Sequence, residues 1–369
     1  MDWSDLFCVS LLQHVYVHRC RTARTLVEAF PEAADLLKLS KREISHWIPD
    51  ENDQATWFNP EIRHQLEAEL QWCAEHKIAL DFLHDPTFPK RLKECPDAPI
   101  LLRRLGSGNP NPRRCLAIVG TRNATPYGKS FARQLVQSAA ALDPAPVIIS
   151  GLAYGIDIEA HRAALDFGLE TQAVFANGLD TIYPSSHRNT AKHIVECGLL
   201  WSEFPQGTPS YPLHFLQRNR IIAGLSDATV LCESALQGGG MATARIAASY
   251  SREVFALPGR VSDPKSAGCN DLIRNQTAQV LTSPEQLWKS LGWEKSKKKK
   301  QVPEELSIFG SPSDLSQTIV RLLTEHLHLT PDQLLEHCPN ASLQDLSIAL
   351  TALELEGLIR QQGGGYEKQ

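Results

Sequence analysis

The chain has 369 residues, and this length predicts two or three domains. Apolar residues make up 42% and charged residues 21%, the balance of a soluble globular protein, and no apolar run is long enough to span a membrane. The formal net charge of -5 at pH 7 excludes an overall basic nucleic-acid binder, so a site for a polyanion must be a local cluster of cations.

Two further features predict a cytoplasmic protein. The first residues, MDWSDLFCVSLLQH, have no basic segment before the apolar stretch and no small-residue cleavage site, so we expect no signal peptide. The nine cysteines form no CxxC pair, and an odd number cannot pair fully within one chain. We therefore expect reduced and buried cysteines.

Residues 1–85 are predicted to form a small helical domain, because apolar residues recur there at spacings of three and four. One of its helices is expected to begin at Pro60, with Asn59 as the N-cap. The next segment, DPTFPKRLKECPDAPILLRRLG, is punctuated by prolines and predicts an extended connector.

Residues 86–293 are predicted to contain a Rossmann-like domain. From Cys115 onward, short apolar runs such as CLAIVG, PVIISG, ATVLCES and EVFALPG alternate with helical patterns. Continuous apolar runs indicate strands that are covered on both faces, and the helices between them indicate parallel crossovers. The predicted fold class is therefore α/β, with a doubly wound parallel sheet.

Residues 294–314 are charged and then contain proline and serine, which predicts a linker, and we interpret its run from Lys297 to Lys300 as solvated. Residues 315–369 are predicted to form three helices and a hairpin, the plan of a winged helix. Thr330 and Ser342 are the expected caps of the second and third helices. The third helix contains no Lys or Arg, so we favour protein contact or packing over duplex binding.

The loops that follow the strands are the expected site, because ligands of a doubly wound sheet bind beyond the carboxyl ends of its strands. The first loop contains Gly120, which permits a tight turn, and Arg122, which would project toward a ligand. A helix that begins near Thr125 and Pro126 would offer free N–H groups to an anion. The spacing is not GxGxxG, so it gives little support to a dinucleotide site.

The second and third loops are less specific. In SGLAYGID, Asp157 is expected to cap the following helix, and a bond to a ligand hydroxyl is the alternative. In ANGLDTIYPSSHRNTAKHI, an aromatic ring and several possible cations surround a helix start, namely Tyr183, His187, Arg188 and Lys192. A solvated surface loop remains an open interpretation of this segment.

The fourth loop is the most informative, because no carboxylate occurs from Phe204 to Ser226. Its helix start gathers rings, cations and an amide: Tyr211, His214, Phe215, Arg218, Asn219 and Arg220. Rings beside cations suit single-stranded nucleic acid, whose bases offer faces and whose phosphates offer charge. The alternative is a core Phe215 and one arginine in an internal ion pair. One of the two arginines is expected to point inward, because residues two apart on a helix do not share a face.

The fifth loop contains three glycines before a predicted helix, Gly238, Gly239 and Gly240, and such a loop can cradle a phosphate. It lacks the lysine of a P-loop, so NTP hydrolysis is not expected. The sequence has no GxSxG or HExxH motif and no Cys/His/Asp spacing that indicates a metal. His161 is interpreted as a hydrogen-bonded core residue, and we expect no catalytic set, metal or cofactor.

Five segments occur in an order that resembles one family: VGTR, SGLAYGID, NGLDTIYPSSHR, SEFPQGTPSYPLHFLQRNRIIAGLS and REVFALPGR. Over roughly residues 85–290 they resemble the DNA-processing protein A family (DprA, also called Smf). The resemblance implies a helical, SAM-like N-terminal domain, a Rossmann-like domain and a winged-helix-like C-terminal domain. It also implies a cytoplasmic protein of natural transformation that binds and protects incoming single-stranded DNA, forms a homodimer and helps to load the RecA recombinase.

The resemblance places the DNA pocket on residues that the loops had already indicated. Together with His214 from the fourth loop, the predicted DNA-binding residues are Arg122, Lys192, His214, Phe215, Arg218, Asn219, Arg220, Gly238, Gly239 and Gly240. Family members usually have Ser-Gly-Ser or Ser-Gly-Ala where this chain has three glycines, so only backbone contacts to a phosphate are retained there. The alternative function is a nucleotide-processing or nucleotide-sensing enzyme of the phosphoribohydrolase type, because QGGGMAT partly resembles the PGGxGT loop of those enzymes, although the glutamate expected downstream is missing.

Overall fold

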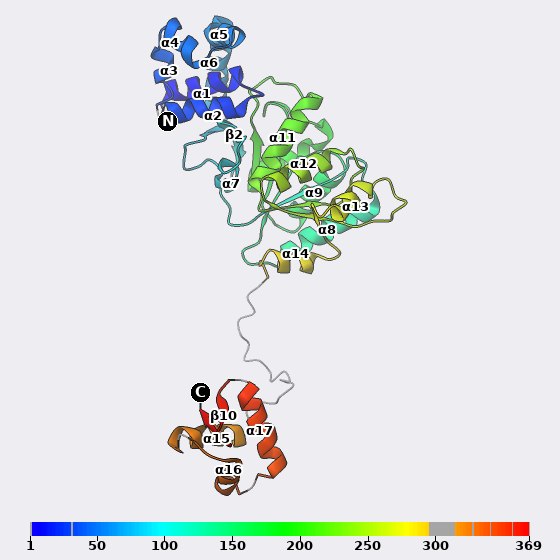
Figure 1. Cartoon of the computed structure of the whole chain (residues 1–369). Coiled ribbons are helices and arrows are strands. Elements are labelled where there is room, and N and C mark those ends of the chain that lie inside the picture. The colour runs from blue at the N-terminus through cyan, green and yellow to red at the C-terminus, as the bar shows by residue number, and fades with distance from the viewer. Residues whose placement is uncertain are drawn as a thin grey trace. The chain divides into compact units, whose positions relative to one another are not determined.

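The computed structural model describes residues 2–30, 32–294, 314–326, 328–339, 341–355 and 357–368 (Figure 1). The chain divides into two compact units, Met1–Lys295 and Ser296–Gln369. Nearly all of the predicted linker, including Lys297 to Lys300, lies outside the described residues. Within the described part of the chain, no helix has both the length and the apolar character needed to cross a membrane.

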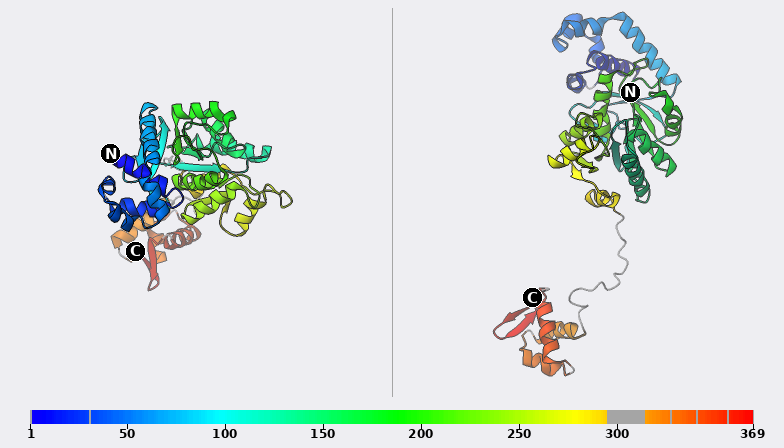
Figure 2. Two further views of the ribbon diagram at one scale, coloured as in Figure 1. Left: turned by 90° about the horizontal axis from the view of Figure 1, so that it is seen from above. Right: turned by 90° about the vertical axis from the view of Figure 1, so that its right-hand side faces the viewer.

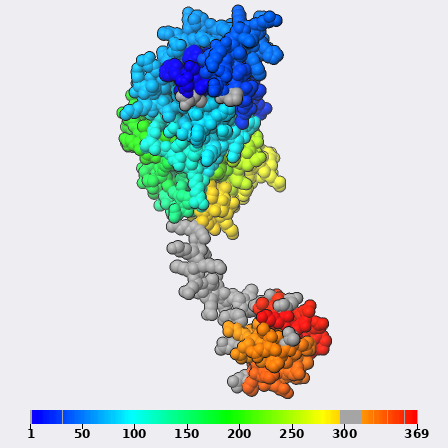
Figure 3. All heavy atoms as spheres, turned by 90° about the vertical axis from the view of Figure 1, so that its left-hand side faces the viewer, coloured from blue at the N-terminus to red at the C-terminus, as the bar shows by residue number. Residues whose placement is uncertain are grey.

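The first unit begins with a run of helices. They are α1 (Trp3–Val15), α2 (Cys20–Ala29), α3 (Asp35–Lys38), α4 (Lys41–Trp47), α5 (Glu51–Phe58) and α6 (Pro60–Glu75). Asn59 accepts hydrogen bonds from the backbone N–H groups of Glu61 and Ile62, which confirms the predicted cap of α6. Most of the buried apolar side chains of these helices belong to the same hydrophobic cluster as one face of the following sheet. Figure 3 shows this region, in blue, packed directly against the cyan part of the chain.

The prediction of an extended connector after this region is wrong. The segment contains a short helix, α7 (Lys90–Lys93), and a strand, β2 (Leu101–Gly106), which pairs with β1 (Ala79–Phe82). β2 also pairs with β6 (Leu199–Ser202) at its other edge. Leu101 and Leu102 are buried at the start of β2, and the prolines of the segment lie outside both elements.

The central sheet has the strand order β1-β2-β6-β5-β4-β3-β7-β8-β9. Its further strands are β3 (Cys115–Val119), β4 (Val147–Ser150), β5 (Thr171–Val174), β7 (Ala228–Leu231), β8 (Glu253–Ala256) and β9 (Gln279–Val280). All pairings from β6 to β9 are parallel, which confirms the predicted doubly wound sheet. The sheet is mixed at one edge, where β2 pairs antiparallel with both of its neighbours.

Helices cover both faces of this sheet (Figure 2). The layer on one face includes α11 (Pro212–Leu225) and α12 (Gly239–Ser249), and the layer on the other includes α8 (Pro126–Ala139), α9 (Ile156–Asp166) and α14 (Pro284–Ser290). The remaining helices are η1 (Ser185–His187), α10 (Arg188–Cys197) and α13 (Ala267–Arg274). Successive residues of β3 alternate between the two layers: Ala117 packs in the first, and Leu116 and Ile118 pack in the second. Such alternation is what a strand buried on both faces requires.

The second unit is a winged helix with its own core. It contains α15 (Asp314–His326), α16 (Pro331–His337), α17 (Leu343–Leu355), β10 (Ile359–Gln362) and β11 (Gly365–Lys368). Thr330 accepts a hydrogen bond from the N–H of Gln333, and Ser342 accepts one from the N–H of Asp345, so both predicted caps are confirmed. The hairpin turns at Gly363, which has a positive φ of 58°. Protein contact by α17 stays a prediction.

Candidate nucleic-acid interface

A cavity of about 630 Å³ lies where the strand order of the sheet reverses. β3 and β7 are neighbours, and the chain proceeds from them toward opposite edges of the sheet. Doubly wound sheets bind ligands at such a point, beyond the carboxyl ends of the strands. Gly120 follows β3 directly, and a Cβ atom there would lie only 2.5 Å from the side chain of Ile156, so this turn requires glycine.

The cavity is lined by loops that follow the strands and by one side of α11. Its lining residues are Val119, Gly120, Thr121, Arg122, Ala153, Asp157, Tyr183, Ser210, Pro212, Phe215, Leu216, Arg218, Asn219, Ile222, Gly238, Gly239, Gly240 and Thr243. The structure therefore brings together most of the residues that were predicted to bind DNA. Arg220, His214 and Lys192 are absent from this lining.

Phe215 lies at the centre of a group of cations and rings. The guanidinium carbon of Arg122 is 4.7 Å from the centre of the Phe215 ring, and that of Arg218 is 5.9 Å from it. The ring of Tyr183 lies 5.6 Å away, centre to centre, and is tilted by 58°. Phe215 is half-buried, so this side chain is neither a closed core residue nor freely exposed. Cation–π contacts of this kind hold guanidinium groups in fixed positions.

Arg218 lines the cavity with only 3% of its surface exposed. Its Nη1 donates a hydrogen bond of 2.6 Å to the carbonyl oxygen of Val174, whereas its Nε has no partner among the described residues. A Cβ atom on Gly151 would lie 1.9 Å from the guanidinium, so glycine makes room for this side chain. Burial lowers the pKa of Arg218 to about 10, and the nearby Asp157 opposes that shift. Arg218 therefore stays a cation at pH 7.

The prediction that Asp157 caps α9 is wrong. Gly155 occupies the N-cap position, and Asp157 lies inside the first turn of the helix. Its carboxylate accepts a hydrogen bond of 3.2 Å from the N–H of Gly151 and is buried near Arg218. Burial raises the pKa of Asp157, and the charge of Arg218 counteracts this effect. Asp157 is thus the internal counter-charge of the cavity's buried arginine, a role that the spacing of the loop did not indicate.

The three glycines form the amino end of α12, which begins two residues earlier than predicted. Gly238 is the N-cap and Gly239 and Gly240 are already helical, with no side chain capping this end. A Cβ atom on Gly240 would lie 2.6 Å from the side chain of Leu231, so the helix packs tightly against β7 there. Asn219 donates a hydrogen bond of 3.4 Å to the carbonyl oxygen of Gly239 and so ties this end to α11. An uncapped helix start is a general anion-binding feature of proteins.

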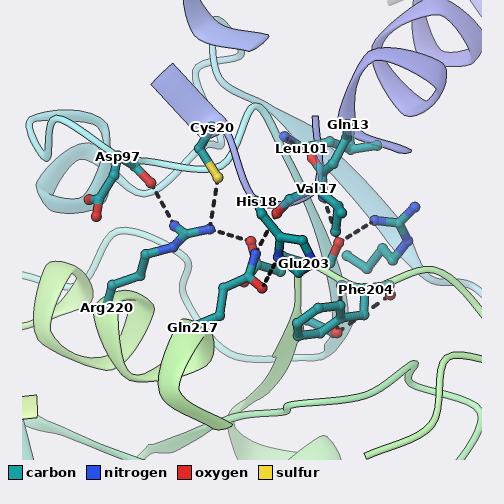
Figure 4. A network of polar contacts seen from close by, with 12 residues as sticks. Gln13, Val17, His18, Cys20, Asp97, Leu101, Glu203, Phe204, Gln217 and Arg220 are labelled. Atoms are coloured by element: carbon teal, nitrogen blue, oxygen red, sulfur yellow. Dashed lines mark hydrogen bonds and ion pairs between the residues drawn. The ribbon is translucent and has the colours of Figure 1, made fainter. Parts of the chain in front are cut away.

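Arg220 lies on a different face of α11 from Arg218. It forms a buried ion pair with Glu203 and donates hydrogen bonds to the carbonyl oxygen of Asp97 and to the sulfur of Cys20 (Figure 4). Burial raises the pKa of Glu203 and Arg220 counteracts it. The structure thus separates the two arginines that sequence alone left ambiguous: Arg218 lines the cavity, and Arg220 is in an internal ion pair.

The other two predicted residues lie beside the cavity. His214 stacks on Phe204, with 4.3 Å between ring centres, and its Nδ1 is 3.0 Å from the carbonyl oxygen of Pro209. Lys192 is exposed on α10. Their contribution to DNA binding stays a prediction.

His161 is confirmed as a hydrogen-bonded core residue. Its Nδ1 lies 2.7 Å from the hydroxyl oxygen of Thr171, and the side chain is fully buried. Burial lowers the pKa of His161 to about 3, so the ring is neutral at pH 7. Within the described ranges, no group of three or more His, Cys, Asp or Glu side chains is arranged to hold a metal ion.

One aromatic side chain near the cavity was missed. Tyr154 lies in SGLAYGID, between β4 and α9, and it faces a smaller cavity together with Arg122 and Phe215. The signal was present in the sequence, because an aromatic residue in a glycine-rich loop after a buried strand has little reason to be there for packing.

A Rossmann-like sheet with a cationic, ring-lined crevice, followed by a winged helix, defines a class of DNA-handling proteins. The chain belongs to the DNA recombination-mediator protein A family, whose model matches residues 79–292. A second model, the DprA winged helix domain, matches residues 300–365. These matches confirm the resemblance inferred from the sequence motifs and extend it to the C-terminal unit.

Individual relatives agree with this assignment. Protein Smf of Escherichia coli is 32% identical over 343 residues, which cover 88% of this chain and 90% of the relative. DNA processing protein DprA of Streptococcus pneumoniae is 37% identical over 199 residues, 54% of this chain and 69% of the relative. The solved structure of the S. pneumoniae protein matches with a TM-score of 0.65 at 29% identity, covering 76% of this chain and 95% of that one. A structure that concerns the single-stranded DNA binding mode of DNA processing protein A from Helicobacter pylori matches with a TM-score of 0.51 at 30% identity, over 57% of this chain and 95% of that one.

Proposed function

We propose that this chain binds single-stranded DNA in the cavity between β3 and β7 and that it acts in natural transformation rather than as a metabolic enzyme. The observation that carries this proposal is the Phe215 ring with the guanidinium groups of Arg122 and Arg218 beside it. Single strands need these two kinds of contact together, because their bases are unstacked and their phosphates are charged.

The amino end of α12 supplies the place for a phosphate. Backbone N–H groups of a helix start attract anions, and no side chain caps this one. Arg122 lines the same cavity, so a phosphate there would also meet a side-chain cation. Backbone contacts of this kind carry no sequence information, and we therefore expect binding with little sequence preference.

We extend the proposal to a homodimer that protects incoming DNA and helps to load the RecA recombinase. The description of the matched family as recombination mediators supports this extension. The H. pylori relative, whose structure concerns a single-stranded DNA binding mode, supports single strands as the ligand. Two equivalent cavities on one strand would raise the effective concentration for the second contact, so a symmetric dimer would bind more tightly than one cavity alone.

Fluorescence anisotropy with labelled oligo-dT tests the proposed ligand. We expect single strands to bind better than duplex, with log affinity falling by about 0.7 per neutralised phosphate for each unit of log salt. Arg122→Ala should weaken binding and flatten this slope. Arg274→Ala removes an exposed cation from α13, far along the chain from the lining residues, and is the matched control. Equal affinity for duplex and single strand at physiological salt would refute the proposal.

The enzymatic alternative rests on the QGGGMAT loop alone. A phosphoribohydrolase would release adenine from AMP, and chromatography of an overnight incubation with the full-length chain would detect the base. We expect intact AMP, because α12 contains no carboxylate that could act on the glycosidic bond.

A further inference from the structure

A smaller cavity lies next to the DNA cavity, beside Phe215. It is lined by Arg122, Gly151, Ala153, Tyr154, Tyr183, Pro184 and Phe215. Four of these residues line the larger cavity too: Arg122, Ala153, Tyr183 and Phe215. The two cavities are therefore adjacent, and the residues around the smaller one extend the site across the loops that follow β4 and β5.

Two tyrosines in this extension, Tyr154 and Tyr183, present more ring surface than Phe215 does. Tyr183 is 47% exposed and Tyr154 is 49% exposed. Phe215 is half-buried, and the guanidinium of Arg122 already lies over its ring. A base that stacks beyond the central cavity therefore finds its open faces on the two tyrosines.

Both tyrosines are held in place although they are exposed. The hydroxyl of Ser186 donates a hydrogen bond of 3.1 Å to the Tyr154 hydroxyl, and the His187 ring packs edge-on against Tyr154 with 4.8 Å between ring centres. Tyr183 packs at a tilt against Phe215. Rings that are fixed before a ligand arrives lose little conformational freedom when a base stacks on them.

Exposed cations continue the site past Tyr154. The first of these cations is Arg162, which lies close to His187, the residue whose ring packs against Tyr154. Burial lowers the pKa of His187, and the positive charge of Arg162 lowers this pKa further. Arg188 begins α10 directly after His187, and Lys192 lies one helical turn further on the same face. These three cations are exposed, and they form no ion pair within the described part of the chain.

We propose that a single strand leaving the DNA cavity continues over Tyr183 and then Tyr154, which stack successive bases, toward the phosphate-binding cations of α10. This inference rests on the proposed function, since it extends the same site by two rings. It also assigns a role to Lys192, which lies outside the central cavity. Because every base has a π-face, such stacking adds affinity without sequence preference.

Oligo-dT of about ten nucleotides, and an abasic strand of the same length, separate stacking from phosphate contact. Tyr154→Ala and Tyr183→Ala should each weaken binding of oligo-dT roughly fivefold or more, and should leave binding of the abasic strand unchanged. Tyr154→Phe and Tyr183→Phe keep the ring and should bind oligo-dT like the unaltered chain. Tyr127→Ala is the matched control, because Tyr127 is a similarly exposed tyrosine that lines neither cavity.

The outcomes are distinct. Unchanged oligo-dT affinity in both alanine variants would overturn this inference and leave the proposed function intact, provided that Arg122→Ala still weakens binding. Equal losses on the oligo-dT and abasic strands would also overturn it, because the tyrosines would then not act through bases. If the unaltered chain fails to bind oligo-dT at low salt, the proposed function and this inference both fail.

Discussion

The guanidinium of Arg122 lies over the ring of Phe215, although Arg122 comes from the loop after β3 and Phe215 comes from the first turn of α11. The pair joins the loop after β3 to α11 at the point where the strand order reverses. The contact with the ring holds the Arg122 guanidinium at the cavity, where it can meet a phosphate.

Phe215→Ala should weaken single-strand binding by about 1–3 kcal/mol with little change in the salt slope, because a ring contact is lost but no charge. Anisotropy titrations at several salt concentrations measure both quantities. Phe215→Tyr keeps the ring and is the control. A lower melting temperature with unchanged affinity would show that Phe215 serves the core instead.

Arg218→Met should weaken binding and also lower the free energy of unfolding by about 1–3 kcal/mol, because it leaves the buried Asp157 without its counter-charge. Adding Asp157→Asn should restore most of the stability, measured by urea denaturation, but none of the affinity. Recovery of both by the double variant would mean that Arg218 has only a structural role.

The pH dependence of stability should contain a contribution from His161. Its folded-state pKa of about 3 lies below its ordinary value near 6.5, so the unfolded state binds a proton before the folded state does. The stabilising contribution is therefore complete above about pH 6.5 and decreases as the pH falls toward 3, by up to about 1.4 kcal/mol per pH unit. His161→Gln removes the titrating group, and its stability should fall less steeply between pH 6.5 and 4.5. Parallel curves for the two chains would contradict this expectation.

A chain that ends near residue 292 should keep most of its affinity for single strands. The two units have separate cores, and no Lys or Arg occurs in α17, the helix that would enter a groove. The same anisotropy assay compares the shortened and full-length chains. Loss of nearly all binding would place the main DNA contacts in the winged helix.

Light scattering at micromolar concentrations should report a homodimer. A monomer at every concentration, with and without oligo-dT, would leave only the single cavity of one chain. Mixing with RecA on the same strand should then show whether the dimer or the monomer is the species that associates.

Sequence patterns predicted the sheet well because the apolar runs of its strands are continuous, and they identified the loops that line the cavity because the fold class dictates where ligands bind. They failed where the decisive contacts are long-range. The segment at Leu101 forms a strand because β6 lies beside it, and the charge of the buried Asp157 is influenced by Arg218, which is distant in sequence. The sequence also could not show which of Arg218 and Arg220 lines the cavity. Arg220 pairs with Glu203, which lies at the start of the loop between β6 and α11, and only the folded chain brings the two together.

α11 carries two constraints at once. One face presents Phe215 and Arg218 to the cavity, whereas the other holds the N-terminal helices: Gln217 donates to the carbonyl oxygen of Val17, and Arg220 to the sulfur of Cys20 (Figure 4). A chimaera that exchanges the N-terminal helices between two relatives should thus fold well only if the residues of α11 that contact these helices, such as Gln217 and Arg220, come from the same relative as the helices. The residues of α11 that line the cavity, such as Phe215 and Arg218, can come from the other relative. The N-terminal helices and the ligand site can therefore be exchanged independently.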